Sequence, residues 1–434
     1  MRFLYSLALY LIAPFVCAML LWRGLRDRSY WHHFAERFGF GEAVPAGGIW
    51  VHAVSVGEVQ AAAALVNRLR ERYSQVPLVV TTFTPTGAAR ARALFETGVR
   101  VRYVPFDLPG SVRRFFGRIR PRIAVIFETE LWPNLYHERA RLRIPLVLAS
   151  ARISRRSVAG YRRLGSLFRE PLGQGIVIAA QAQVDAERFQ ALGADAAHTH
   201  VTGNIKFDLA VPPDIEQRGT LLRQQYAAGR PMWVAGSTHA GEDEIVLEAH
   251  AGVRRKHPGA LLAIAPRHPN RFDEVAAGLE RARVSFRRRS REASATTAPT
   301  AASATTAPTA SDPEVLLVDT LGELLDFYAA GDVAFVGGSL VPIGGHNLLE
   351  PAALGKPVLT GPHNSNGAEV AKLLISRGAA KVVTDAEQLR AAVDECLCDP
   401  VERERIGAIG RGCVADNRGA LAKLLGLIEP LMRD

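Results

Sequence analysis

Cysteine is scarce in this chain, which holds only Cys17, Cys396, Cys398 and Cys413 among its 434 residues. A fold held together by disulfide bonds needs a much higher density, so the sequence excludes a secreted disulfide scaffold and fits a reducing compartment. Disorder is excluded as well, because 48% of the residues are hydrophobic and only 22% are charged. The length favours two domains of roughly 200 residues each over one.

Charge is absent from residues 3–22. As a helix, this run would cover roughly 30 Å, which is the thickness of the hydrocarbon layer of a bilayer. We therefore expect residues 1–28 to form a membrane anchor. A cleaved signal peptide is disfavoured because no small-residue cleavage site follows the run, and a buried core helix is the other alternative. Pro14 could break the helix, which leaves open whether the segment crosses the bilayer or lies in one leaflet.

Basic residues are in excess, 53 against 43 acidic ones, so the formal net charge is +10. This predicts an anionic partner, which could be nucleic acid, an acidic membrane or a phosphorylated substrate. The excess that follows the apolar run places the body of the protein in the cytoplasm. The flanking residues are Arg2 before the run and Arg23, Arg26 and Arg28 after it. Two other groups either face anionic lipid or are ordinary solvated helix faces: Arg113, Arg114, Arg118, Arg120 and Arg122, and Arg155, Arg156, Arg162 and Arg163.

Short β-branched runs alternate with amphipathic stretches from residue 48 onward. This alternation indicates an α/β fold with parallel strands, right-handed crossovers and helices on both faces of the sheet. It starts again near residue 232, after a Val211-Pro212-Pro213 segment that suits a semi-rigid connector. We therefore expect two doubly wound Rossmann-like domains, residues 29–210 and 211–434, with a cleft between them. The expected strands are residues 49–54, 77–83, 99–106, 123–127, 145–149, 176–180 and 200–203, then 232–235, 261–265, 315–318, 333–336, 357–359 and 381–383.

An internal duplication interrupts the second domain, with SATTAPTA at residues 294–301 and again at 303–310. It offers no side chain that could anchor a core, so we expect a flexible surface insert over residues 290–313. The preceding Arg287-Arg288-Arg289 either touches anionic headgroups or forms a solvated basic edge.

Polar and glycine-rich clusters follow six of the expected strands. In doubly wound sheets, ligands bind beyond the carboxyl ends of the strands, so we expect the clusters to face a common cleft. Each cluster alone is also ordinary turn or helix-start chemistry. The clusters are Ser55-Val56-Gly57-Glu58, Glu128-Thr129-Glu130, Gly203-Asn204-Ile205-Lys206, Gly236-Ser237-Thr238-His239, Pro266-Arg267-His268 and Gly337-Gly338-Ser339.

The segment from Gly344-Gly345-His346-Asn347 to Glu350-Pro351-Ala352 joins paired glycines to the start of an expected helix. Paired glycines let the backbone approach a ligand closely, and free N–H groups near Asn347 could bind a phosphate. Glu350 would then point its carboxylate at sugar hydroxyls. The alternative is a glycine turn capped by Asn347, with Glu350 only favouring the helix dipole.

Together, these motifs resemble the 3-deoxy-D-manno-octulosonic acid (Kdo) transferase family. The similar strings also include Leu131-Trp132-Pro133-Asn134, Phe207-Asp208 and Gly361-Pro362-His363, and the alanine- and threonine-rich insert departs from the family pattern. The resemblance implies a GT-B glycosyltransferase on the cytoplasmic face of the bacterial inner membrane. The implied reaction moves Kdo from CMP-Kdo to a phosphorylated lipid A precursor, lipid IVA, with inversion at the anomeric carbon.

An inverting transfer needs a base for the acceptor hydroxyl and positive charge for the departing phosphate. We assign Glu58 as the general base and rank Glu36 below it, because Glu36 precedes the first strand. Lys206 and Arg267 can stabilise the departing phosphate by their positive charge. The resemblance assigns Glu128 to transition-state stabilisation, and the sequence leaves open whether it pairs with Lys206, contacts the sugar or holds the loop. The resemblance also implies a donor-binding set of Arg267, His268, Leu321, Gly322, Glu323, Asn347, Leu348, Leu349 and Glu350. We expect the side chains of Leu321, Leu348 and Leu349 to lie in the core, so that only their backbone could reach CMP.

The implied partners are CMP-Kdo, the phosphorylated lipid A precursor and the anionic surface of the inner membrane. We expect no cofactor and no metal, since Asp-x-Asp motifs are absent near the strand ends and Cys396-x-Cys398 has no second ligand pair. Another GT-B enzyme, such as a UDP-sugar transferase or epimerase, remains an alternative. A nucleic-acid-binding membrane protein would explain the charge, but no nucleic-acid module is present, so we expect no nucleic-acid partner.

Overall fold

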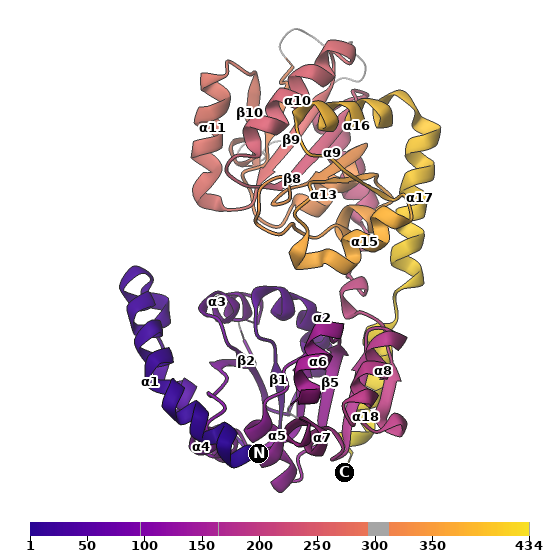
Figure 1. Cartoon of the computed structure of the whole chain (residues 1–434). Coiled ribbons are helices and arrows are strands. Elements are labelled where there is room, and N and C mark those ends of the chain that lie inside the picture. The colour runs from indigo at the N-terminus through magenta and orange to yellow at the C-terminus, as the bar shows by residue number, and fades with distance from the viewer. Residues whose placement is uncertain (96, 164, 294–311, 434) are drawn as a thin grey trace. The chain divides into compact units, whose positions relative to one another are not determined.

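The computed structural model describes residues 1–95, 97–163, 165–293 and 312–433, and the chain forms two compact units. Unit 1 combines Met1–Asp208 with Asn417–Asp434, and unit 2 is Leu209–Asp416. Each unit is built on a sheet of seven parallel strands (Figure 1). The predicted α/β architecture of two doubly wound, GT-B-type Rossmann-like units is therefore confirmed.

The sheet of unit 1 has the strand order β3-β2-β1-β4-β5-β6-β7. All seven strands predicted for this half are present, with ends shifted by a few residues. In β1, Ile49 and Val51 pack into one core while Trp50 packs into the core on the opposite face. Burial on both faces explains why the strands appear as continuous apolar runs. The strands are β1 Gly48–His52, β2 Leu78–Thr82, β3 Val99–Tyr103, β4 Pro121–Phe127, β5 Leu146–Ala151, β6 Ile176–Ala180 and β7 Thr199–Val201.

Helices cover both faces of this sheet (Figure 1). The helices of unit 1 are α1 Arg2–Arg26, α2 Val56–Arg72, α3 Pro85–Leu94, α4 Pro109–Ile119, α5 Pro133–Arg141, α6 Arg155–Arg163, α7 Ser166–Leu172, α8 Gln183–Ala191 and α18 Ala420–Leu431. Short 3-10 turns, η2 Phe34–Phe38 and η4 Ile205–Phe207 among them, join these elements.

The sheet of unit 2 has the order β10-β11-β9-β8-β12-β13-β14. Its six predicted strands are present, and the edge strand β10, Phe286–Arg288, was not predicted. Most of the predicted insert, residues 290–313, lies outside the described residues. The other strands are β8 Met232–Thr238, β9 Leu261–Pro266, β11 Val315–Leu317, β12 Val333–Val336, β13 Val358–Thr360 and β14 Ala380–Val382. The helices are α9 Ile215–Tyr226, α10 Asp243–Lys256, α11 Phe272–Arg281, α12 Arg289–Ala293, α13 Leu324–Ala330, α14 Leu349–Ala353, α15 Ala368–Ser376, α16 Ala386–Cys398 and α17 Pro400–Asp416.

The last helix, α18, belongs to unit 1, so the expectation that residues 211–434 all lie in the second domain is wrong for this segment. Ala420, Leu424 and Ile428 are buried in a core of unit 1. Asp208 fixes the start of the helix, because its two carboxylate oxygens accept hydrogen bonds from the backbone N–H groups of Gly419 and Leu421, at 2.7 and 2.6 Å. One side chain thus satisfies two of the N–H groups that a helix leaves free at its start.

We expect the Asp208→Ala variant to loosen α18. Losing a helix-capping acceptor costs about 1–2 kcal/mol, and the freed N–H groups then exchange with solvent faster. Hydrogen exchange across residues 417–431 is the measurement. Asp208→Asn, which keeps one acceptor oxygen, should give an intermediate result, and unchanged protection in Asp208→Ala would contradict this role.

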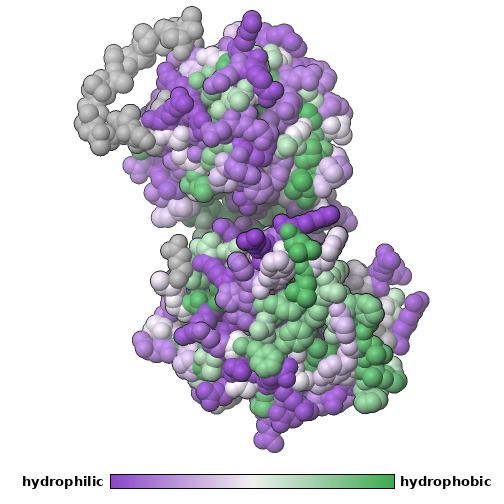
Figure 2. Space-filling model, turned by 90° about the vertical axis from the view of Figure 1, so that its left-hand side faces the viewer, coloured by the Kyte–Doolittle hydropathy of each residue, from purple (hydrophilic) through white to green (hydrophobic). Residues whose placement is uncertain are grey.

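Helix α1 is long and apolar enough to cross a membrane, and little of it is buried in the protein. It runs without a break through Pro14. Its exposed apolar side chains contribute to the hydrophobic face in Figure 2 and include Phe3, Leu4, Leu7, Leu11, Ile12, Phe15 and Met19. The start of the helix nevertheless contacts unit 1, since Tyr5 Oη donates to Asp107 Oδ2 at 2.9 Å and Ser6 Oγ to Asn134 Oδ1 at 3.1 Å. This apolar helix is able to anchor the chain to a membrane.

Candidate functional site

Glu58 lies in the first turn of α2, just beyond the carboxyl end of β1. Its Oε2 accepts the backbone N–H of Val54 at 2.8 Å, and its Oε1 accepts the Ser55 hydroxyl at 3.1 Å. These bonds fold the carboxylate back over the residues that precede the helix. Burial raises the pKa of Glu58 to about 7, and the negative charges of Glu128 and Glu130 act in the same direction. A carboxylate tuned in this way can hold or release a proton near neutral pH.

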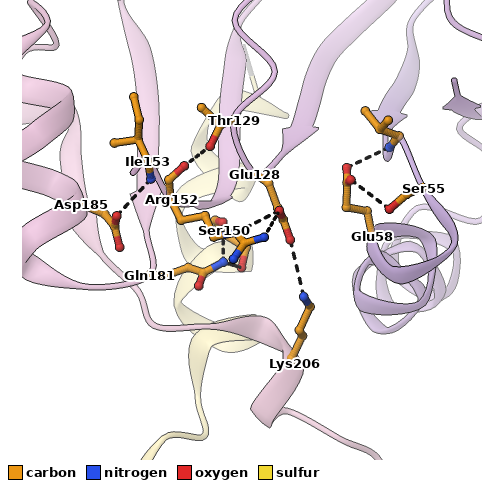
Figure 3. A network of polar contacts seen from close by, with 11 residues as sticks. Ser55, Glu58, Glu128, Thr129, Ser150, Arg152, Ile153, Gln181, Asp185 and Lys206 are labelled. Atoms are coloured by element: carbon orange, nitrogen blue, oxygen red, sulfur yellow. Dashed lines mark hydrogen bonds and ion pairs between the residues drawn. The ribbon is translucent and has the colours of Figure 1, made fainter. Parts of the chain in front are cut away.

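Glu128 and Lys206 form an ion pair, with Oε1 and Nζ 3.5 Å apart. On its other side, Glu128 Oε2 accepts Arg152 Nε at 3.0 Å (Figure 3). Glu128 has a φ of +57°, a left-handed conformation that non-glycine residues adopt only at a cost of about 1–3 kcal/mol. Such backbone strain is concentrated at functional sites. Of the three proposed catalytic residues, Glu128 and Lys206 are therefore in direct contact. Glu58 is not bonded to them, but it lies close enough to Glu128 for that negative charge to raise its pKa.

Lys206 is positioned by buried neighbours on both sides. Ile205 and Phe207 are 4% and 5% exposed, and they anchor η4 in unit 1. Asn204 Oδ1 accepts the N–H of Lys206 at 3.0 Å. With the backbone fixed at three consecutive residues, the lysine side chain extends to Glu128 at the carboxyl edge of the sheet.

The competing carboxylate, Glu36, is engaged elsewhere in unit 1. Its Oε2 accepts the backbone N–H of Tyr103 at 2.9 Å, at the end of edge strand β3, and His33 Nδ1 lies 3.5 Å from its Oε1. These contacts give Glu36 a role in holding η2 against β3.

In unit 2, Arg267 and His268 follow β9, and the imidazoles of His239 and His346 lie close to His268. The Nε2 atoms of His239 and His346 lie 2.8 Å apart, and the two rings are nearly parallel, with an interplanar angle of 6° and 5.1 Å between their centroids. His268 meets His239 edge-on, at 5.3 Å between ring centroids. Burial lowers the pKa of His346 to about 4, and the positive charge of Arg267 contributes to this. The pKa values of His239 and His268 are also lowered, chiefly by burial.

The glycine turn after β12 encloses a side chain of the protein itself. Glu242 is fully buried, and its carboxylate accepts the backbone N–H groups of His239, Gly338, Ser339 and Leu340 at 2.6 to 2.9 Å. A Cβ added at Gly338 would come within 2.9 Å of the His346 ring. The turn therefore positions the two histidines. The N–H groups of Gly338, Ser339 and Leu340 are already bonded to Glu242 and are not available to a ligand.

Glu350 is bonded to Asn347, whose Nδ2 donates to Glu350 Oε1 at 3.1 Å. Burial raises the pKa of Glu350, while Arg267 and the Asn347 hydrogen bond oppose this effect. Asn347 Oδ1 also accepts the N–H of Leu349 at 3.1 Å, so one of the N–H groups considered for phosphate binding is already bonded. Leu348 and Leu349 are buried, as expected.

The predicted donor residues after β11 are fixed by a separate set of bonds. Arg289 Nη2 donates to Glu323 Oε1 at 2.8 Å, and Thr320 donates to Oε2. Burial alone would raise the pKa of Glu323, but these bonds keep it below its usual value. Gly322 has a φ of +88°. Leu321 is 72% exposed, so the expectation that its side chain lies in the core is wrong.

The basic triplet before the insert is largely engaged in ion pairs within unit 2. Arg288 pairs with Asp319 and Asp273, at 2.6 and 2.7 Å, and Arg289 pairs with Glu323. These pairs connect β10 and the start of α12 to neighbouring elements. The sequence predicted either contact with anionic headgroups or a solvated basic edge, and neither interpretation included this structural role. Within the part of the chain that the structure describes, no group of three or more His, Cys, Asp or Glu side chains could hold a metal ion.

Sequence reasoning missed Arg152, Glu242 and the pairing of His239 with His346 as parts of the site. Arg152 directly follows β5, so the strand-end rule that identified Glu128 could have found it. His239 and His346 stand in two of the quoted motifs, but 107 residues separate them and no sequence signal joins them.

Comparisons of the sequence with known proteins point to one family, and the similarity extends over the whole chain. A family model described as 3-deoxy-D-manno-octulosonic-acid transferase (kdotransferase) matches residues 32–209. The 3-deoxy-D-manno-octulosonic acid transferases of Haemophilus influenzae and Bordetella pertussis are 39% and 38% identical to this chain, each over 99% of both chains. The fold alone is shared with a glycosyltransferase from Rickettsia africae, at 13% identity and a TM-score of 0.53 over 89% of this chain and 99% of that one. Given this full-length identity, the chain belongs to the 3-deoxy-D-manno-octulosonic acid transferase family.

Proposed function

We propose that this chain is a glycosyltransferase that moves Kdo from CMP-Kdo to a hydroxyl of the lipid A precursor, with inversion at the anomeric carbon. Full-length identity to Kdo transferases supports the substrate class. The observation that carries the mechanism is the partly buried Glu58, with its pKa near 7, close to the Glu128–Lys206 pair.

Glu58 acts as the general base. It takes the proton of the acceptor hydroxyl while the oxygen attacks the anomeric carbon and the bond from that carbon to the CMP phosphate breaks. Lys206 supplies positive charge near the reacting groups, and it is held by Glu128, which is itself fixed by Arg152. Such preorganised charge stabilises a transition state without the reorganisation that water would need.

Donor binding is assigned to residues of unit 2. Arg267 offers a guanidinium to the CMP phosphate, with His268 beside it, and Glu350 accepts hydrogen bonds from ribose hydroxyls. Asn347 orients Glu350, and Leu348 and Leu349 line the donor with their backbone, although the N–H of Leu349 is already bonded to Asn347. The exposed Leu321-Gly322 turn and Glu323 lie in the loop after the neighbouring strand β11 and complete the donor set.

The acceptor is a phosphorylated lipid in an anionic leaflet of the inner membrane, on its cytoplasmic side. The exposed apolar face of α1 supports membrane attachment. Arg155, Arg156, Arg162 and Arg163 of α6 are exposed, and no ion pair is recorded for them in the described part of the chain. They follow β5 at the same sheet edge as Glu128, and each basic residue near an anionic surface contributes about 1 kcal/mol. By contrast, Arg114 and Arg118 of α4 donate to the backbone of Phe38 and Gly41.

Product mass analysis tests this function. The purified full-length protein in detergent, given CMP-Kdo and a tetraacylated lipid A precursor, should yield the precursor increased by the mass of one or more Kdo units and release CMP. A UDP-sugar consumed in place of CMP-Kdo would favour another GT-B enzyme, and no transfer from either donor would contradict the proposal.

A further inference from the structure

His239 and His346 of unit 2 are joined directly to each other by a hydrogen bond between their rings, and the proposed donor-binding roles of Arg267 and His268 do not account for this bond. The Nε2 atoms of His239 and His346 are 2.8 Å apart, so only one proton can lie between them. In the neutral pair, one ring therefore donates through Nε2, and the other accepts there and carries its own proton on Nδ1. One further proton can be added, at the free Nδ1 of the donating ring, without breaking the bond between the rings.

The surroundings of the pair set when that extra proton is stable. The positive or potentially positive groups that act on the pair are Arg267, His268 and Arg271. The nearby carboxylate is Glu242, and its oxygens already accept four backbone N–H groups. Adding a proton to the pair is unfavourable here, because it would create an unpaired cation in a partly buried place. An anion bound beside Arg267 would make the protonated pair the favoured form.

We propose that the His239–His346 pair takes up one proton from solvent when the donor phosphate binds, and so becomes a cation that helps to hold the phosphate. The inference rests on the proposed function, in that it places a nucleotide phosphate beside Arg267. The positions of both rings are fixed beforehand, since the Glu242 cradle holds the N–H of His239 and the glycine turn against which His346 packs. By linkage, binding is then tighter at lower pH, by up to about tenfold per pH unit while one whole proton is taken up.

Calorimetry of the full-length protein in detergent measures this uptake directly. The probe is the methyl ester of CMP, a phosphodiester like CMP-Kdo that does not itself titrate near neutral pH. Titrations in two buffers of different ionisation enthalpy, at several values between pH 6 and pH 8, give the number of protons taken up. We expect a clear uptake by the wild-type protein and much less by His239→Gln and His346→Gln, which keep an amide in place of the titrating ring. His257→Gln, at the C-terminal end of α10, is the matched control and should behave as the wild type does.

Two results would overturn the inference and leave the proposed function standing. In one, the wild-type protein binds the ester without proton uptake. In the other, both glutamine variants take up as many protons as the wild-type protein does. The wild-type result decides by itself if the variants do not fold. Failure of the wild-type protein to bind either CMP or its ester would contradict the proposed function and this inference together.

Discussion

Replacing Glu58 with glutamine is expected to lower kcat by about 10²- to 10⁴-fold, the usual contribution of a general base. Glutamine keeps an oxygen that can accept the N–H of Val54 or the Ser55 hydroxyl, so the start of α2 should stay folded. It cannot take a proton from the acceptor hydroxyl. Steady-state transfer from CMP-Kdo, together with CMP binding by calorimetry, separates the two effects, because donor binding should stay nearly unchanged.

Glu71→Gln is the matched control for this variant, since Glu71 is exposed on the same helix and its carboxylate forms an ion pair with the equally exposed Arg68. It should keep the wild-type rate. A Glu58→Gln enzyme that turns over at the wild-type rate would remove Glu58 from the mechanism, and Glu36 would then be the next carboxylate to test.

The pH dependence of the wild-type enzyme follows from the same residue. A base works only when it is unprotonated, and burial raises the pKa of Glu58 to about 7. The rate should therefore fall as the pH drops through about 7 and level off above it, and the free-enzyme value is read from kcat/KM.

Removing the carboxylate of Glu242 is expected to be the most destabilising single change in unit 2. Glu242→Ala leaves four backbone N–H groups without their acceptor, and each buried donor left unsatisfied costs about 1–3 kcal/mol. We expect a loss of at least about 3 kcal/mol in the stability of the turn after β12. Glu242→Gln should be nearly as damaging, because its amide group points a donor at other donors.

Hydrogen exchange of Gly338, Ser339 and Leu340 is the suitable measurement for this loss, since a chain of two units need not unfold in one step. Glu248→Gln, at an exposed position of α10, should leave the exchange unchanged. Protection that persists in Glu242→Ala would show that the turn holds its shape without the carboxylate.

The regular part of the fold was predictable because it is encoded locally. Thirteen strands were expected, and all thirteen are present, since strands buried on both faces leave apolar runs in the sequence. Strand β10 was missed because Phe286-Arg287-Arg288 is short, lies at an edge and carries charge. The strand-end rule likewise found Glu58, Glu128 and Lys206, and the structure joins the last two in an ion pair.

The parts of the structure that the sequence did not predict include contacts between residues far apart in the chain. Asp208 bonds to the start of α18 across 211 residues, and Glu242 reaches the turn after β12 across about one hundred. A capping aspartate and a buried glutamate look like ordinary polar residues until their partners are known. That the acidic residues of unit 1 and the basic residues of unit 2 serve one reaction stays a prediction.

Attachments on both sides of α1 constrain how it can meet a bilayer. Tyr5, near its start, is bonded to Asp107, and Phe38, beyond its end, accepts a hydrogen bond from Arg114. Both partners belong to unit 1. As long as these bonds hold, both ends of this unbroken helix stay on the same side of any bilayer that it meets, so it can lie along the surface of the lipid but cannot cross it.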